Sequence, residues 1–300
     1  MSTDVEKNEV NRRTFLMQFA ALGVGTSVLS SCSRMMSSGG AGASAGANMI
    51  GLQLYTVRDL LEKDFEGTLE RVAQIGYTNM EFAGYYNRTP EQVRAVLDRL
   101  KMVSKSSHIG AQLMRTDAAA QIRVAQVLGQ EYITIPSYNF GRDAGIDAWK
   151  KGAAEFNQWG ALCKNAGMRL GYHNHAAEFA KVDGGPTGYD VLMHETDPAL
   201  VDFEMDLYWT AFADQDPVAL FAKYPGRFAM WHVKDLQLTG TTKGMTPVGS
   251  GMLDFRRYFA NARQAGMKYF FVEHDTAAAY PGGSLASIQA SYTYLHGILA

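Results

Sequence analysis

Residues 200–235 read LVDFEMDLYWTAFADQDPVALFAKYPGRFAMWHVKD and contain the pattern that decides the fold. An apolar run at 200–207 is followed by a helical segment that begins at Asp216-Pro217 and ends near Tyr224. Gly226 stands just before a second apolar run at 228–235, in the place where glycine commonly ends a helix. The stretch therefore predicts a strand, a helix and a second strand, which is the repeating unit of a parallel sheet.

The same unit repeats from Met49 to the end of the chain. Apolar runs that we interpret as strands lie at 50–55, 79–83, 103–109, 132–136, 169–175, 200–207, 228–235 and 269–275. Helical patterns follow them, and the one that begins at Thr89-Pro90 carries a clear start signal. The count and length predict a (β/α)8 TIM barrel over 49–300. A doubly wound open sheet is the alternative, but residues 55–58, YTVR, are not a glycine-rich phosphate loop.

The first 31 residues are expected to be a signal peptide and not part of the fold. Residues 11–16, NRRTFL, form a twin-arginine pattern, and an uncharged, mostly apolar run continues to Ser31. Residues 29–32, LSSC, resemble the lipobox of bacterial lipoproteins, in which Cys32 would carry the lipid. The alternative is an uncleaved membrane anchor, because the apolar run approaches spanning length.

Residues 32–48, rich in Ser, Gly and Ala, are then a flexible linker between the lipid and the barrel. These features predict a protein exported by the twin-arginine route and held in the periplasm by its lipid. Cys163 is left without a partner cysteine, so we expect no internal disulfide.

The charge distribution argues against nucleic acid as a partner. The chain has 28 basic and 30 acidic residues, a net charge of −2, and no block of like charges. Contact with a membrane is expected only through the lipid anchor. The sequence makes no prediction of the oligomeric state.

Ionisable residues gather at the ends of the predicted strands, where barrels build their active sites. Side chains alternate along a strand, so residues two apart share a face. The candidates are Gln53, Tyr55, Glu81, His108, His173, His175, Glu204, Asp206, His232, Lys234, Glu273 and Asp275. Asp235 and Asp275 also suit the simpler role of helix N-caps. Three carboxylates with one imidazole favour a divalent ion such as Mn, Mg, Co or Zn.

These strand ends carry a resemblance to a known family. The chain resembles the xylose-isomerase-like barrel proteins grouped as sugar phosphate isomerases/epimerases. The matching motifs are GLQLYTVR at 51–58, YHNH at 172–175, EF at 178–179, DLYW at 206–209, WHVKD at 231–235, VGSG at 248–251 and VE at 272–273.

The resemblance implies one divalent metal held by Glu178, Asp206, His232 and Glu273. Sugar epimerases of this group carry the first of these glutamates at the end of the fifth strand, where this chain has His173-Asn174-His175. Either Glu178 reaches the metal or one of the histidines replaces it. We favour Glu178 as the ligand.

The implied chemistry is proton abstraction next to a carbonyl, through an enediolate. Candidate bases are His175, His173, Glu81 and Glu273, and Lys234 would stabilise the developing oxyanion. Candidate substrate-binding residues are Gln53, Tyr55, His108, Trp209 and Ser250. Ser250 lies between two glycines, near where barrels often bind phosphate, although a tight turn explains those glycines equally well.

The main prediction is therefore a metal-dependent sugar isomerase or epimerase that acts on a small, unphosphorylated carbohydrate, since sugar phosphates are cytoplasmic. The first alternative is a metal-dependent lyase or hydratase on 3-keto-glycosides or related keto-sugars. A non-catalytic sugar-binding lipoprotein and an abasic-site endonuclease are further alternatives. The endonuclease is disfavoured by the near-neutral charge.

Overall fold

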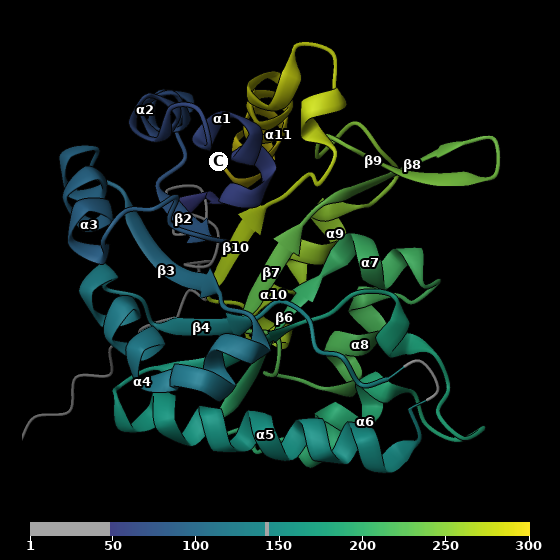
Figure 1. Ribbon diagram of the computed structural model, residues 1–300. Helices are drawn as coiled ribbons and strands as arrows, with labels where there is room; N and C mark the ends of the chain where they lie inside the picture. Colours follow the sequence, from purple (N-terminus) through teal and green to yellow (C-terminus); the bar gives the residue numbers. More distant parts are fainter. Residues whose placement is uncertain (1–48, 142–143) are drawn as a thin grey trace, which may run out of the picture. The chain divides into compact units, whose positions relative to one another are not determined.

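A computed structural model describes residues 49–141 and 144–300. In these ranges eight parallel strands close into a barrel, each hydrogen-bonded to two neighbours (Figure 1). The barrel strands are β1 (Gly51–Gln53), β2 (Asn79–Phe82), β3 (Val103–His108), β4 (Tyr132–Ile135), β5 (Arg169–His173), β6 (Val201–Asp206), β7 (Met230–Val233) and β10 (Tyr269–Val272). The predicted TIM barrel is confirmed. The predicted signal peptide and linker lie outside the described residues.

Helices follow the strands and cover the outside of the barrel (Figure 1). They are α1 (Arg58–Leu61), α2 (Phe65–Ile75), α3 (Pro90–Arg99), α4 (Ala111–Leu128), α5 (Ile146–Asn165), α6 (Gly188–Glu195), α7 (Leu207–Phe212), α8 (Pro217–Lys223), α9 (Phe255–Ala260), α10 (Ala262–Ala265) and α11 (Gly283–Leu299). Three single turns, η2 (Leu54–Val57), η3 (Ala177–Phe179) and η4 (Ala277–Ala279), lie at the mouth. The predicted start of α3 is confirmed, because Thr89 and Gln92 form a reciprocal capping box.

One element was not predicted. The run at 228–235 does not continue as one strand, because β7 ends at Val233 and an antiparallel hairpin begins at Asp235. Its strands are β8 (Asp235–Thr239) and β9 (Thr242–Thr246), and it projects from the barrel (Figure 1). Gly240 takes a positive φ of 62° in the turn. The sequence LTGTT at 238–242 contains this turn signal, so the hairpin could have been found.

The lower half of the barrel interior is closed by packed side chains. Tyr132, Met230 and Phe271 form a buried cluster there. Gly171 leaves room for it, since a Cβ at that position would lie 2.8 Å from the Met230 methyl carbon. The polar side chains therefore lie above this plug, towards the carboxyl ends of the strands.

Two further features concern the outer layer. Cys163 is a free and fully buried thiol of α5. Among the described helices, none has both the length and the apolar character that a membrane crossing requires.

Candidate metal centre and active site

A cavity of about 500 Å³ opens at the carboxyl ends of the barrel strands. Its walls contain His108, His173, His175, Lys234 and Glu273, with Tyr55, Arg58 and Asp275 nearer the rim. The structure thus brings most of the predicted site residues to one place. Arg58 was not predicted; its guanidinium donates to the backbone oxygens of Tyr55 and Asp275 and stacks on the Tyr55 ring.

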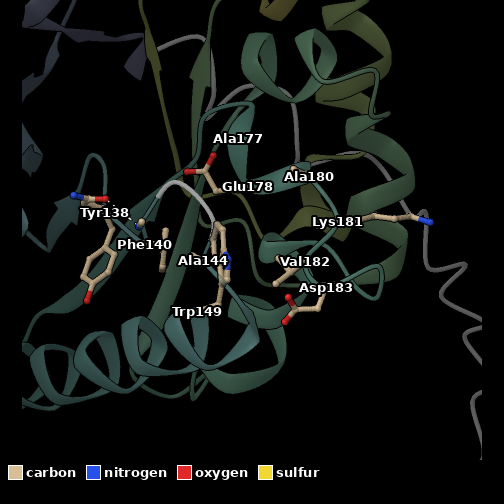
Figure 2. Close-up of a pocket in the computed structure, with 12 residues that line it drawn as sticks. Tyr138, Phe140, Ala144, Trp149, Ala177, Glu178, Ala180, Lys181, Val182 and Asp183 are labelled. Atoms are coloured by element: carbon tan, nitrogen blue, oxygen red, sulfur yellow. Dashed lines mark hydrogen bonds between the residues drawn. The ribbon is translucent and has the colours of Figure 1, made fainter.

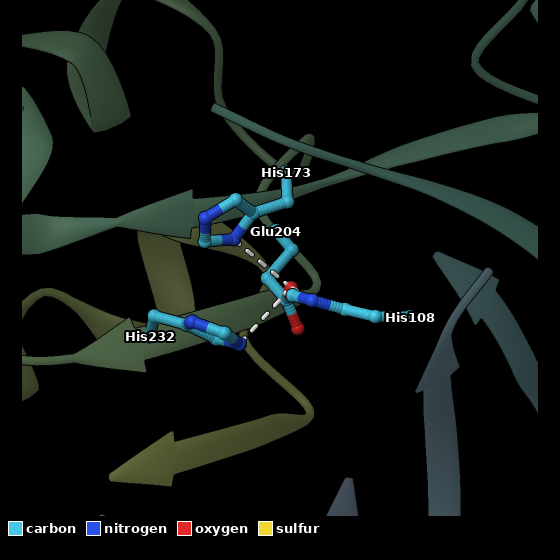
Figure 3. A group of neighbouring side chains, drawn as sticks. All are labelled: His108, His173, Glu204 and His232. Atoms are coloured by element: carbon cyan, nitrogen blue, oxygen red, sulfur yellow. Dashed lines mark hydrogen bonds and ion pairs between the residues drawn. The ribbon is translucent and has the colours of Figure 1, made fainter. Parts of the chain in front are cut away.

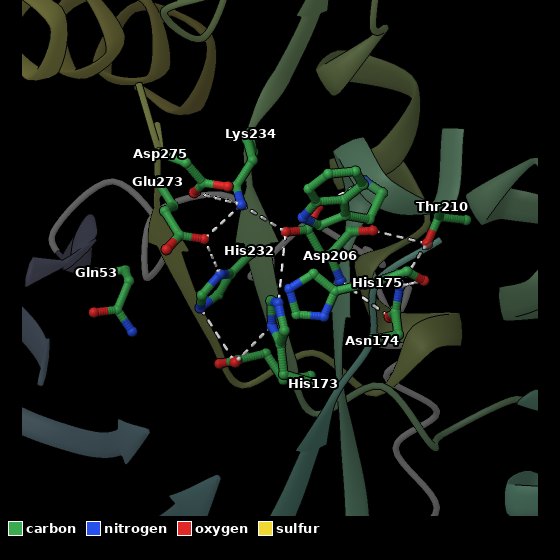
Figure 4. Close-up of polar contacts among 12 residues, drawn as sticks. Gln53, His173, Asn174, His175, Asp206, Thr210, His232, Lys234, Glu273 and Asp275 are labelled. Carbon is green, nitrogen blue, oxygen red and sulfur yellow. Dashed lines mark hydrogen bonds and ion pairs between the residues drawn. The ribbon is translucent and has the colours of Figure 1, made fainter. Parts of the chain in front are cut away.

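Asp206, His232 and Glu273, of which Glu273 lines this cavity, lie together with ligand atoms within 4.8 Å of one another (Figure 4). The Nδ1 atom of His232 lies 2.7 Å from Oε2 of Glu273. The Nε2 atom of His173 lies 3.7 Å from Oδ2 of Asp206. These four side chains come from β5, β6, β7 and the residue after β10, so neighbouring strands present them to one point.

Glu178 does not join this group. Its Oε1 accepts a hydrogen bond from the Tyr172 hydroxyl at 2.8 Å, and its Oε2 accepts from the backbone N–H of His175 at 3.1 Å. Tyr172 faces outward from β5 and stacks on Phe156 of α5. The carboxylate of Glu178 is therefore turned to the outside of the barrel, and His173 is the fifth-strand side chain that faces Asp206.

Lys234 is buried among carboxylates at the same place. Its Nζ lies 2.7 Å from Glu273 Oε2, 3.0 Å from Asp206 Oδ2 and 2.9 Å from Asp275 Oδ1. Burial disfavours the charge on Lys234, but these carboxylates outweigh burial and raise the pKa of Lys234 well above its usual value. The ammonium therefore stays charged.

A second group lies one layer deeper, where Glu204 meets three imidazoles (Figure 3). Glu204 Oε2 lies 2.8 Å from His108 Nε2 and 3.2 Å from both His173 Nδ1 and His232 Nε2. Glu204 lies two residues before Asp206, so the alternation of β6 puts both on the inner face. Glu204 is one of the strand-end candidates of the sequence analysis, and the structure places it in this deeper layer.

Glu81 completes this deeper layer instead of facing the cavity. Its Oε2 accepts from Gln53 Nε2 at 2.9 Å and lies 2.6 Å from His232 Nε2. Burial and the nearby Glu204 raise the pKa of Glu81. Glu81, which is a predicted base, and Gln53, which is a predicted substrate contact, are both fully buried. Glu81 contacts His232 and Gln53 contacts Glu81, so neither side chain lines the cavity.

The charges in these two layers fit a divalent cation. Five carboxylates lie around one ammonium and three imidazoles, so the two layers offer several buried oxygen and nitrogen ligands. Burial and the neighbouring His232 lower the pKa of His173 well below its usual range, which keeps that imidazole neutral and able to bind a metal. Glu204 Oε1 and Glu81 Oε1 are buried and make no hydrogen bond, and Asp206 Oδ2 has only its ion-pair contacts with Lys234 and His173. His173, Asp206, His232 and Glu273 are the set that would hold the ion.

His175 lies at the rim, above the metal ligands. Its ring is 5.5 Å from that of Trp209 and lines the cavity. Burial lowers the pKa of His175, so its imidazole is a neutral base near pH 7. Between the two histidines, Asn174 has a structural role, because its Oδ1 accepts from the backbone N–H of Asp206.

Ser250 does not line the cavity, and the backbone amides of the loop around it already bind the carboxylate of Asp235. The Asp235 carboxylate accepts from the backbone N–H groups of Gly249 and Gly251 through Oδ2, and from those of Leu236 and Leu253 through Oδ1. Asp235 thus orders this loop and does not cap a helix. A Cβ on Gly251 would lie 2.4 Å from Asp235 Oδ1, so the close approach requires glycine there.

Comparison with known proteins agrees with this geometry. The chain matches the family described as xylose isomerase-like TIM barrel over residues 69–291, and it belongs to that family. An inosose dehydratase of Clostridium perfringens is 26% identical over 258 residues, which cover 73% of this chain and 86% of that protein. The family and this relative identify the chain as an enzyme of the isomerase, epimerase or lyase type that acts on a small carbohydrate.

Two solved structures are also similar. A sugar phosphate isomerase/epimerase from Parabacteroides distasonis is 28% identical, with a TM-score of 0.71 over 88% of this chain and 97% of that one. The IOLI protein, solved with a bound zinc atom, has a TM-score of 0.66 over 84% of this chain and 98% of that one, at 11% identity. The second likeness concerns the fold alone.

Proposed function

We propose that the protein is a metal-dependent lyase that removes a group from the carbon β to the carbonyl of a keto-sugar. The observation that carries the proposal is the pairing, at one cavity, of the His175 imidazole, whose pKa burial lowers, with the buried ammonium of Lys234. The fifth strand offers no inward carboxylate of the kind that the epimerases use. Inosose dehydratases, the relatives named above, remove water from a keto-sugar.

The chain's own residues divide the work. A cation held by His173, Asp206, His232 and Glu273 would polarise the ketone and acidify the neighbouring C–H. A ring nitrogen of His175 takes that proton. Lys234 Nζ exchanges its rim partner Asp275 for the departing oxygen and protonates it. The C–H and C–O bonds break, a C=C bond forms, and no oxidant is needed. Acid–base groups of this kind contribute about 10²–10⁴ in rate.

The cavity favours a substrate without phosphate. Of the two cationic side chains in its wall, Lys234 contacts three carboxylates and Arg58 donates to two backbone oxygens. The amide groups of the loop at 249–253 already bind Asp235. A phosphate would therefore meet carboxylates without a free cation or amide cradle to bind it.

Epimerisation is the second candidate, and the likeness to the sugar phosphate isomerase/epimerase favours it. Both reactions share the first proton transfer and differ in the second step, which is reprotonation in one and loss of the β-group in the other. The test is to incubate the metal-loaded protein with a keto-inositol and with 3-keto-glycosides in D₂O and to identify the products by mass spectrometry. Loss of water or of the aglycone supports the lyase.

Deuterium uptake at unchanged composition would support the epimerase instead. Neither product, with metal bound at one equivalent, would overturn both candidates and favour a sugar-binding protein without turnover. The Asp206→Ala variant is the control, because it keeps the cavity wall and removes a metal ligand.

A further inference from the structure

The carboxylate of Glu204 contacts three imidazoles, and we propose that it is the positioning residue of the metal centre. By binding one ring nitrogen of His173 and one of His232, it directs the other nitrogen of each ring at the cation. This inference rests on the metal centre of the proposed function, and not on the choice between lyase and epimerase.

The two rings that would hold the ion face it with different nitrogen atoms. His173 has its Nδ1 3.2 Å from Glu204 Oε2 and its Nε2 3.7 Å from Asp206 Oδ2. His232 is turned the other way, with Nε2 3.2 Å from Glu204 Oε2 and Nδ1 2.7 Å from Glu273 Oε2. Each ring therefore spans the two layers, with one nitrogen at Glu204 and the other among the metal ligands.

Glu204 must accept hydrogen bonds from at least two of its three rings. The ring of His108 also reaches Glu204 Oε2, at 2.8 Å from Nε2, so three imidazoles converge on one oxygen (Figure 3). A carboxyl oxygen carries at most one proton, so it could donate to one ring only. A neutral imidazole that donates through one nitrogen has a lone pair on the other. Donation from Nδ1 of His173 and Nε2 of His232 therefore leaves the lone pairs that a metal ion requires.

Packing alone does not explain a carboxylate at this position. The side chain of Glu204 is fully buried, and its Oε1 has no hydrogen-bond partner. Such a group costs stability that an apolar residue of similar size would not. A role in orienting metal ligands accounts for it, because carboxylates that accept from metal-binding histidines fix the tautomer and the direction of the ring.

Two neighbouring carboxylates do not take this role for His173. Glu81 contacts Nε2 of His232 at 2.6 Å, and its other contacts are with His108 and a glutamine amide. Glu178 lines a different pocket, of about 650 Å³, and its carboxylate accepts from a tyrosine hydroxyl and a backbone N–H (Figure 2). His232 thus has two carboxylates on its far nitrogen, whereas His173 depends on Glu204.

The test compares two variants of equal shape in the same layer. Glu204→Gln replaces an acceptor oxygen by a donor amide, so affinity for Zn²⁺ should fall by about 10- to 100-fold. Glu81→Gln is the matched control, because Glu81 is also fully buried and contacts His232. Its affinity should stay within about threefold of the wild type, since Glu204 still binds both rings. Competition with a metal-chelating dye measures the affinities, and circular dichroism checks the fold.

The tautomers can be read in the metal-free wild type, without any variant. Long-range proton–nitrogen NMR of isotope-labelled histidine distinguishes a ring nitrogen that carries hydrogen from one with a lone pair. We expect the hydrogen on Nδ1 of His173 and on Nε2 of His232. In Glu204→Gln the His173 ring should lose this preference, whereas in Glu81→Gln it should keep it.

Unchanged Zn²⁺ affinity in Glu204→Gln, or hydrogen on Nε2 of His173 in the wild type, would overturn the inference. Loss of the ion from His108→Ala with its retention by Asp206→Ala would also overturn it, because Glu204 would then be a ligand in the deeper layer. A wild type that binds no divalent ion would overturn the metal centre and the inference with it. The expected order of affinities without turnover of any keto-sugar would support the inference and contradict the proposed reaction.

Discussion

His173 is the residue at which this chain departs from the sugar epimerases that it resembles. An imidazole there carries no charge, so the cation would be held by two carboxylates and two neutral rings. Such a set suits Zn, Co or Mn better than Mg, which prefers oxygen ligands. The ammonium of Lys234 contacts the same carboxylates, so its positive charge would lie close to the cation and repel it.

The first prediction separates His173 from Glu178 as the fifth-strand ligand. His173→Ala should weaken metal affinity by about 10-fold or more, whereas Glu178→Gln should leave affinity within about threefold, because its carboxylate faces Tyr172. Titration with a metal-chelating dye measures both. If Glu178→Gln loses the metal and His173→Ala keeps it, the sequence-based assignment of Glu178 stands.

The second prediction concerns Lys234. Lys234→Met removes an ammonium that lies 2.7 Å from Glu273 and 3.0 Å from Asp206, so metal affinity should rise by about 10-fold while kcat falls by about 10²–10⁴. Lys243→Met is the control, since Lys243 pairs with exposed Asp214 on the hairpin side. Weaker metal binding by Lys234→Met would contradict the idea that the ammonium and the metal ion compete for Glu273 and Asp206.

The site was predictable in part, and the limits have physical causes. Alternation along a strand and the strand-end rule place Asp206, His232, Lys234 and Glu273 together in the structure. Neither rule predicts the orientation of a side chain in a loop. The sequence therefore favours Glu178 as a metal ligand, whereas in the structure Tyr172 and the His175 backbone hold its carboxylate outside the barrel. Likewise, no pattern reveals that Glu81 is covered by His232.

At the scale of elements, the seventh strand–helix unit shows what hydrophobic periodicity can and cannot predict. The run at 228–235 begins with four apolar residues, which predicts a strand, but periodicity does not show that the ladder with β10 ends at Val233. From Asp235 the chain pairs with β9 instead, and the loop back to α9 is ordered around the Asp235 carboxylate. Short strands and capped helices can be predicted because their sequence signals are local. This loop could not be predicted, because it depends on hydrogen bonds to Asp235, which is distant in the sequence.

The third prediction tests that acceptor. Asp235→Ala removes a buried carboxylate that accepts from four backbone N–H groups, so the free energy of unfolding should fall by about 3 kcal/mol. Asp254→Ala, which removes the cap of α9, should cost about 1 kcal/mol. Urea unfolding of both variants measures the difference. Equal losses would mean that Asp235 is an ordinary cap.

For the whole molecule, we expect the barrel to fold without the metal. The barrel has a large apolar core between strands and helices, and its lower interior is packed by Tyr132, Met230 and Phe271. The (β/α)8 fold could be predicted from the sequence because the strand–helix unit repeats eight times. The segments at 1–48 keep their sequence-based interpretation as an export signal and linker.

The fourth prediction comes from this independence. Chelation should leave the circular dichroism spectrum unchanged and lower the Tm, because a ligand that binds only the folded state adds about 2.7 kcal/mol at a hundred times its Kd. Asp206→Ala should unfold at the same Tm with and without added metal. Loss of the barrel on chelation would show that the ion is structural.

The fifth prediction concerns export. Replacement of Arg12 and Arg13 by lysine should retain the full-length precursor in the cytoplasm, and Cys32→Ala should release the domain from the membrane. Cell fractionation with immunoblotting measures both. Normal membrane recovery of the two variants would contradict the lipoprotein interpretation.

The pairing of β1 with β10 has a consequence for how the molecule is made. These strands lie at opposite ends of the folded sequence, yet Gly51 and Leu52 align with Phe271 and Val272, and Tyr77 donates to the backbone oxygen of Ile288 in α11. During synthesis the growing chain therefore has two open sheet edges until its last strand emerges, a state in which strands can pair with other chains. Closure is a late event with high contact order, and it is slow for that reason. A chaperone that shields β1 and β7 during this interval would raise the yield of barrel, and a ribosome stalled before residue 269 would leave a product that aggregates.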